Sequence, residues 1–164
     1  MSAHPVSDAA TDHIHLALAI DLATANIADG GGPFGAVIVR DGRIVGRGQN
    51  RVTRDNDPSA HAEVTAIRAA CRELGDFSLA GSTLYSSCEP CPMCLSTALW
   101  ARIDRIVFAA DRHDAAAGGF DDLAFYDLFA TPRDRWEVRI EQQEAAEHFR
   151  PFAVWLAAEG RTAY

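Results

Sequence analysis

Ser87-Cys88-Glu89-Pro90-Cys91-Pro92-Met93-Cys94 is the segment around which this chain is organised. Its cysteines are three residues apart, and prolines flank the middle one. A Cys-x-x-Cys turn presents two sulfur atoms to one metal ion, and zinc takes thiolate and imidazole ligands in a tetrahedron. The segment therefore predicts one half of a zinc site, at the point where a strand ends and a helix begins.

The other half of this site is expected upstream, at His61-Ala62-Glu63. His61 with Cys91 and Cys94 makes three protein ligands, and a catalytic zinc site keeps its fourth position open for water. Two alternatives are a structural zinc site with Cys88 as fourth ligand and a redox Cys-x-x-Cys pair. The catalytic interpretation is favoured, because neither alternative has a use for an unliganded carboxylate, Glu63, beside a ligand.

Length and composition favour one cytoplasmic domain. The chain has 164 residues, of which 48% are apolar, enough to form a core without disulfides. The metal takes two or three of the four cysteines, which leaves no disulfide framework and favours a reducing compartment. The first twelve residues lack a basic segment followed by an apolar one, so we expect no signal peptide.

The charge of the chain bears on its partners. The formal net charge is −8 and the sequence pI is about 5.1. An acidic surface repels phosphate backbones, so RNA and DNA are disfavoured as partners, although a local basic patch remains compatible with this charge. No apolar run approaches the length needed to cross a membrane, so no membrane partner is expected.

The first half of the chain alternates helix and strand signals. Apolar spacing over residues 12–28 predicts an amphipathic helix. Asp41-Gly42 is a strong hairpin signal between strands at 35–40 and 43–49. A loop at 51–58 leads into further expected elements: a helix at 60–74, a strand at 83–87 and a helix from Pro90 or Cys91 to about Ala101.

The second half continues this alternation. Residues 103–110 are almost continuously apolar, as in a parallel strand covered on both faces. A loop with Gly118-Gly119 leads to a helix from Asp121 or Asp122 to Phe129, and alternating apolar residues near 136–140 predict a fifth strand. The last helical region, 143–158, is expected to break at Pro151. The order predicts an α/β fold, a three-layer α/β/α sandwich with a mixed five-stranded sheet.

The chain resembles the cytidine deaminase-like superfamily over nearly its whole length, and within it the bacterial guanine deaminases. The zinc deaminase signature, His-x-Glu followed by Pro-Cys-x-x-Cys, specifies only the superfamily. Other matching segments are Gly32 to Val39, Asn56 to Pro58, His61 to Arg68, Trp100 to Arg102, Gly119 to Asp122, and the terminal Tyr164. The loop with Asp122 and the terminal tyrosine point to the guanine branch.

The resemblance implies roles at the matching positions. It implies that zinc is held by His61, Cys91 and Cys94, that Glu63 moves protons and that Asp122 is a second proton carrier. The purine-binding residues that it implies are Phe34, which stacks on the base, Asn50, which hydrogen-bonds its edge, Ala62, Trp100 and Tyr164. Apart from the metal ligands and Glu63, each has an alternative: core packing for Phe34 and Trp100, a turn residue for Asn50, a helix cap for Asp122 and a frayed terminus for Tyr164.

The resemblance also implies an assembly and a reaction. The family forms a homodimer that exchanges C-terminal segments, so one domain of residues 1–164 would pass a segment of about 143–164 to its partner. The implied reaction is zinc-dependent hydrolysis of guanine to xanthine and ammonia. Guanosine, aminotriazines, cytosine and tRNA adenosine are alternative substrates, and a zinc-stabilised binding module without catalysis is the alternative from another class.

Overall fold

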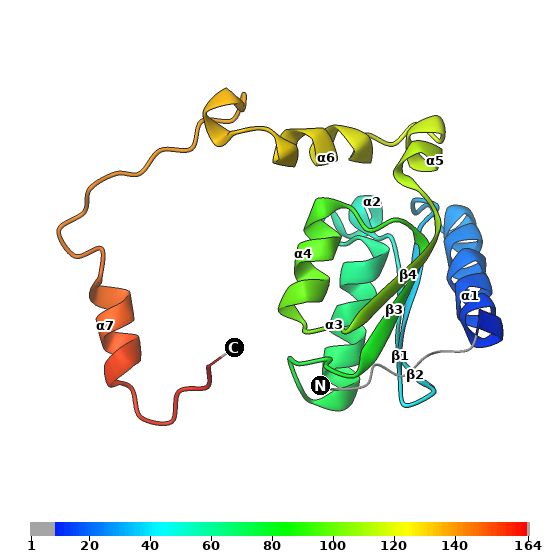
Figure 1. The fold of residues 1–164 in the computed structure, drawn as a ribbon, viewed down its shortest axis with the longest axis horizontal. Coiled ribbons are helices and arrows are strands. Elements are labelled where there is room, and N and C mark those ends of the chain that lie inside the picture. The colour runs from blue at the N-terminus through cyan, green and yellow to red at the C-terminus, as the bar shows by residue number, and fades with distance from the viewer. Residues whose placement is uncertain (1–8, 164) are drawn as a thin grey trace. The chain divides into compact units, whose positions relative to one another are not determined.

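The computed structural model describes residues 9–163. The chain divides into two compact units, one up to Ala130 and one from Thr131 onward. The first unit contains both helices and strands, whereas the described part of the second contains helical turns and loops (Figure 1). In chain order the elements are α1 (Ala9–Ala28), β1 (Gly35–Arg40), β2 (Arg43–Gln49), α2 (Val52–Asp55), α3 (Ala62–Leu74), β3 (Ser82–Cys88), α4 (Pro92–Trp100), β4 (Arg105–Ala110), α5 (Arg112–Ala117), α6 (Asp122–Ala130), η1 (Arg133–Arg135) and α7 (Arg150–Ala157).

The sheet of the first unit is mixed, with strand order β2-β1-β3-β4. β1 pairs antiparallel with β2 and with β3, whereas β3 and β4 are parallel. The expected hairpin is confirmed, because β1 and β2 are joined across Asp41 and Gly42, which both have positive φ. The α/β class and the mixed sheet are thus as predicted.

Helices cover both faces of this sheet (Figure 1). Alternate residues of β1 separate the two sides: Val37 and Val39 pack with Leu18 and Leu22 of α1, whereas Ile38 belongs to the cluster on the opposite side. That cluster also contains residues of α3 and α4, among them Ala66, Ile67, Ala70 and Ala98. The period of two along a strand thus forms the two cores of the α/β/α sandwich.

The prediction of a fifth strand is wrong: the described sheet has four strands. Trp136, Val138 and Ile140 alternate in sequence, but they lie after η1 in a segment without strand structure. The described part of their unit holds no strand for them to pair with, and alternation alone forms no ladder. The C-terminal helix is also shorter than predicted, because α7 begins at Arg150 and has Pro151 in its first turn. Proline has no backbone N–H, and in the first turn of a helix that N–H would have no partner within the helix.

Three smaller differences concern helices and an edge. β4 is parallel as expected, but it is the outermost strand of the described sheet, and its Phe108 is 42% exposed rather than covered on both faces. Helix α5 occupies part of the segment interpreted as a loop, where Asp111 and Asp114 form a capping box. The short α2 lies within the predicted loop at 51–58.

Candidate active site

Three side chains of metal-ligating type converge between the first turns of α3 and α4. The ligating atoms of His61, Cys91 and Cys94 all lie within 4.8 Å of one another. His61 Nδ1 is 3.6 Å from Cys91 Sγ and 3.5 Å from Cys94 Sγ. A tetrahedral zinc ion, with Zn–S of about 2.3 Å and Zn–N of about 2.0–2.1 Å, holds sulfur and nitrogen ligands about 3.6 Å apart. The donor set and its spacing therefore fit zinc.

The local structure explains why these atoms meet. His61 is the N-cap of α3 and Cys91 is the N-cap of α4, and both have extended backbone conformations, with ψ of 159° and 166°. Neither side chain caps its helix by a hydrogen bond, so each is free to turn toward the site. Pro92 occupies the first turn of α4 and fixes its start, which places Cys94 one turn further along.

The electrostatics of the two cysteines suit a cation. Two helix N-termini point at the site, and their partial positive charge favours thiolates. The Cys94 thiol donates a hydrogen bond that lowers the pKa of Cys91 to about 4, and the same bond raises the pKa of Cys94. The hydrogen bond to Cys91 likewise raises the pKa of His61. A divalent cation bound by these residues would replace the shared proton, and both sulfur atoms would then ligate as thiolates.

Cys88 stays outside this ligand group. Its thiol is buried and lies 3.6 Å from the carbonyl oxygen of Asp111. Burial is the main cause that raises its pKa to about 11. Among the described residues, the group whose ligating atoms lie within 4.8 Å of one another contains three residues and not Cys88, and three protein ligands is the count of a catalytic rather than a closed structural zinc site.

Glu63 lies beside the ligands in the first turn of α3 and is buried, with 6% of its surface exposed. Ser86 Oγ donates to its Oε1 at 3.3 Å, and Cys94 Sγ lies 3.4 Å from its Oε2. Burial is the main cause that raises the pKa of Glu63. A carboxyl group that is buried, lies near the metal ligands and has a raised pKa has the properties of a general acid–base.

A pocket of about 200 Å³ opens over these residues. Phe34, Asn50, His61, Glu63, Cys91 and Asp122, all predicted from the sequence, contribute to its lining. Asp122 is the first residue of α6, and its pKa is raised by burial first and by the negative charge of Cys91 second. The pocket therefore brings two carboxyl groups with raised pKa to one cavity that is also lined by two of the three metal ligands, His61 and Cys91.

Among the lining residues that were not predicted, Phe120 and Glu89 make side-chain contacts that bear on the site. Phe120 packs edge-on against Phe34, with ring centroids 4.7 Å apart, and so fixes the orientation of that ring. Glu89 lines the pocket and is held by Arg112, whose Nη2 is 2.5 Å from Glu89 Oε1. The signal for Phe120 was present in the Gly119-Phe120-Asp121-Asp122 segment, but only the packing shows that its ring reaches the pocket.

Three residues predicted to bind the substrate do not contribute to the described lining of this pocket. Ala62 is fully buried in the core between the sheet and α3, directly behind His61. Trp100 lies at the opposite end of α4 from the ligands, 63% exposed, with the Arg102 guanidinium 5.6 Å from its ring centroid. Tyr164 lies outside the described residues. Their substrate-binding roles stay predictions.

Known proteins share this sequence and architecture. Residues 9–110 match the family described as cytidine and deoxycytidylate deaminase zinc-binding region. Guanine deaminase of Bacillus subtilis (strain 168) is 50% identical over 138 residues, which cover 84% of this chain and 88% of that protein. The X-ray structure of guanine deaminase from Bacillus subtilis matches with a TM-score of 0.88 and 46% identity, over 93% of this chain and 98% of that one. A protein solved in complex with 2,6-diaminopurine matches with a TM-score of 0.65 and 33% identity, over 68% of this chain and 62% of that one.

Proposed function

The chain belongs to the cytidine and deoxycytidylate deaminase family, and we propose that it hydrolyses guanine to xanthine and ammonia. One observation carries this proposal: a buried carboxyl group, Glu63, shares a pocket with a ligand group that fits zinc. The choice of guanine rests on the guanine deaminase of Bacillus subtilis, whose similarity extends over most of both chains.

His61, Cys91 and Cys94 would hold the zinc ion, which when bound supplies Lewis-acid activation of a water molecule. Glu63 takes a proton from the attacking water as its oxygen bonds to C2 of guanine. The same carboxyl group delivers that proton to N3, so that the ring stays neutral as C2 becomes tetrahedral. A raised pKa suits the first step, because it makes the Glu63 carboxylate a stronger base toward the proton of the water.

Asp122 would serve the leaving group. The bond from C2 to the exocyclic nitrogen breaks only when that nitrogen carries enough protons to leave as ammonia. Asp122 lies in the same pocket as Glu63, and its raised pKa favours the protonated form that such a donor needs. As the C2 carbonyl forms, the hydroxyl proton would pass to the Glu63 carboxylate, and proton exchange with solvent would then return Glu63 to its ionised form and Asp122 to its protonated form. Two carboxyl groups would thus divide the proton transfers between the ring nitrogen and the leaving amine.

Phe34 and Asn50 would hold the base in place. Phe34 offers a ring face, and Phe120 packs against it edge-on. Asn50 Oδ1 accepts a hydrogen bond from the backbone N–H of Val52 at 3.3 Å, which leaves its amide N–H groups to a purine acceptor. A base without the matching hydrogen-bonding group leaves a buried protein group unpaired, which weakens its binding by about 1–3 kcal/mol per group. This difference is enough to select among purines.

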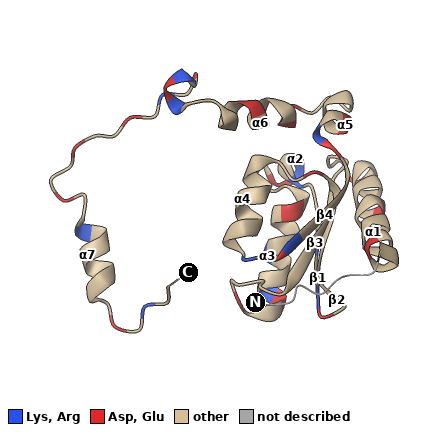
Figure 2. Ribbon diagram, viewed as in Figure 1, with Lys and Arg blue, Asp and Glu red and all other residues tan. Residues whose placement is uncertain are grey.

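A panel of substrates tests the reaction. Ammonia release is measured from guanine, guanosine, adenine, cytosine and tRNA, with zinc-loaded wild type and the Glu63→Gln variant. Guanine should be the preferred substrate, and Glu63→Gln should keep its zinc but lose turnover by about 10²–10⁴-fold. Faster ammonia release from another compound of the panel would show that guanine is not the preferred substrate. Ammonia release by Glu63→Gln at the wild-type rate would show that Glu63 takes no part in the proton transfers. Figure 2 shows acidic and basic positions dispersed over the described elements, which supports a small substrate over tRNA.

We also propose a homodimer that exchanges C-terminal segments, with Tyr164 closing the pocket of the partner. The support is the surface of α7, where Phe149, Phe152, Val154, Trp155 and Leu156 are each at least 43% exposed. A helix with this much exposed apolar surface needs a covering partner. Exchange of an identical element is a low-cost route to a two-fold dimer, and a lid that excludes water strengthens the hydrogen bonds beneath it.

Removal of residues 161–164 tests this assembly. The truncated protein should stay folded and zinc-loaded and lose most guanine turnover. It is then co-refolded with full-length Glu63→Gln chain, so that a mixed dimer pairs an intact catalytic site with the tail of the other chain. Partial return of activity is expected. A mixed dimer that is confirmed by mass and stays inactive would contradict a tail that acts across the interface.

The proposed place of action is the cytoplasm, on the basis of the free cysteines. Cys71, Cys88, Cys91 and Cys94 form no disulfide in the structure. Within residues 9–163, no helix combines the length and the apolar character that a membrane crossing requires.

A further inference from the structure

Asn26, near the C-terminal end of α1, is a fully buried polar side chain that the proposed chemistry does not use. Its amide nitrogen Nδ2 donates to the carbonyl oxygen of Gly32 at 2.8 Å and to that of Asn50 at 2.7 Å. Both neighbours are acceptors, so the orientation of the amide is determined. One side chain therefore joins two segments of the chain, one at Gly32 and the other at Asn50, which are 18 residues apart in sequence.

These two segments form one wall of the pocket. The N–H of Phe34 donates to Gly32 O at 2.8 Å, and the N–H of Asn50 donates to Phe34 O at 3.1 Å. Together with the two bonds from Asn26, these bonds close a ring through Gly32, Phe34 and Asn50, all of which line the pocket. The spacing between the two residues proposed to bind the purine thus depends on the Asn26 amide.

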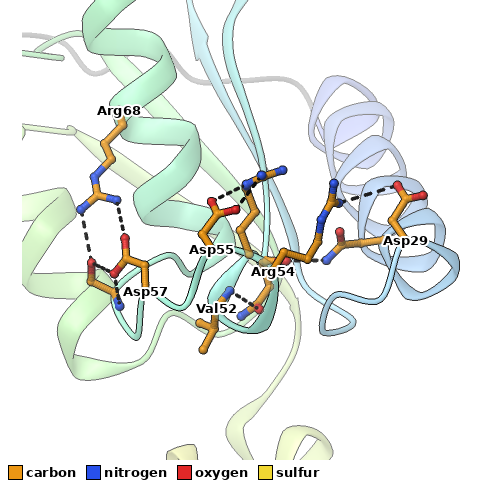
Figure 3. Close-up of polar contacts among 10 residues, drawn as sticks. Asp29, Val52, Arg54, Asp55, Asp57 and Arg68 are labelled. Carbon is orange, nitrogen blue, oxygen red and sulfur yellow. Dashed lines mark hydrogen bonds and ion pairs between the residues drawn. The ribbon is translucent and has the colours of Figure 1, made fainter.

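The outer side of this wall is held less firmly. Thr53 Oγ1 donates to Gly30 O at 3.1 Å, and Arg54 lies 3.9 Å from Asp29, as Figure 3 shows for that pair. Both contacts involve exposed side chains and contribute little to stability. The buried Asn26 amide is consequently the side chain that most firmly attaches the 29–34 loop to the segment that begins α2, beside the backbone bond from Asn50 N–H to Phe34 O.

We propose that Asn26 is a positioning residue for purine recognition: its amide ties Gly32 to Asn50 and so supports the direct backbone bond that holds Phe34 beside Asn50. This inference rests on the proposed function, because it assumes that these two residues bind the base. Asn26 touches neither the base nor the metal ligands. Its loss should therefore weaken binding of ground state and transition state alike, which raises KM and leaves kcat unchanged.

The neighbouring Gly31 offers a second way to disturb the same amide. A Cβ atom at Gly31 would lie 2.2 Å from Asn26 Nδ2 and 2.7 Å from its Oδ1. The three nearest atoms to that Cβ all belong to the Asn26 side chain. Gly31→Ala should therefore act by displacing the amide, and removal of the amide in Asn26→Ala should make room for the added methyl group.

The experiment measures kcat and KM for guanine, the Kd for the ring analogue 8-azaguanine by calorimetry, zinc content and Tm. Asn26→Ala and Gly31→Ala should each raise KM and Kd about tenfold, with kcat within about twofold of wild type and full zinc. The matched control is Gln49→Ala, because Gln49 Nε2 donates to Leu22 O at 2.8 Å and also joins α1 to β2, outside the pocket lining. It should lower Tm and leave KM and Kd unchanged.

The double variant Asn26→Ala/Gly31→Ala completes the test. Its KM should equal that of Asn26→Ala alone, since Gly31→Ala then has no amide to displace. Additive effects, a KM change no larger than that of Gln49→Ala, or loss of zinc in both single variants would overturn the positioning role. Failure of wild type to release ammonia from guanine would instead refute the proposed function, and 8-azaguanine binding separates the two outcomes.

Discussion

Replacing Gly48 by alanine should separate the helix that carries His61 and Glu63 from the sheet. Gly48 lies on β2 against the first turns of α3, where a Cβ atom would be 2.1 Å from Ala62 O and 2.4 Å from Ala66 N. These are backbone atoms of a helix, which cannot rotate aside as a side chain can. Ordinary contact begins at 3.4 Å, so α3 has to move by about 1.3 Å, from 2.1 to 3.4 Å.

This displacement acts on one part of the site only. His61 and Glu63 move with α3, whereas Cys91 and Cys94 belong to α4 and its N-cap. Metal–ligand distances tolerate about ±0.2 Å, so the three ligands no longer fit one ion well. We expect zinc affinity to fall by at least about 10–100-fold. Guanine turnover at saturating zinc should fall by about 10²-fold, as for a catalytic group misplaced by 1 Å.

Zinc affinity is measured by competition with a chromophoric chelator, and turnover by ammonia release at saturating zinc. The control is Gly42→Ala in the hairpin turn, where φ is +73° and no atom lies within 4 Å of the added Cβ. It strains the backbone without pushing on α3, so it should lower Tm and keep zinc affinity and turnover. Wild-type zinc affinity and turnover in Gly48→Ala would contradict the predicted displacement of α3, as would equal losses in Gly42→Ala.

Three further changes test other parts of the site. Cys91→Ala should lose zinc by elemental analysis and Cys88→Ala should keep it; full zinc in the former, or loss only in the latter, would contradict the ligand set. Asp122→Asn should lower kcat while 8-azaguanine affinity changes less, as for a group used mainly in the transition state, whereas a lower Tm alone would indicate a helix cap. Glu89→Gln removes a carboxylate whose pKa is lowered by hydrogen bonds from Arg112. Because the pKa of Glu89 is lower in the folded protein than the unfolded value of 4.5, the ionised carboxylate stabilises the fold above pH 4.5, and this stabilisation is lost as pH falls through the folded pKa. The variant should therefore have a lower Tm than wild type at neutral pH and the same Tm in acid. A Tm difference that persists in acid would exclude this ion pair as its source.

Local chemistry made most elements of the first unit predictable. The hairpin strands at 35–40 and 43–49 were found at their observed bounds, because Asp41-Gly42 accepts positive φ and apolar residues flank it. The start of α4 was predicted to within two residues: the expected start was Pro90 or Cys91, and the helix begins at Pro92 with Cys91 as its N-cap. The expected fifth strand was wrong because a strand needs a partner edge, and alternation at 136–140 carries no information about one.

Residue types and their spacing were enough to predict the chemistry of the site: an imidazole, two thiols and a carboxylate in the pattern of a zinc deaminase. How these groups act depends on the folded chain. The 3.5 and 3.6 Å distances between His61 and the two sulfur atoms depend on how closely α3 and α4 pack. The raised pKa of Glu63 comes from burial, and the wall that Asn26 holds together joins segments distant in sequence. Ligand types are properties of single residues, whereas distance, burial and pKa arise from the packing of many residues and so become visible only in three dimensions.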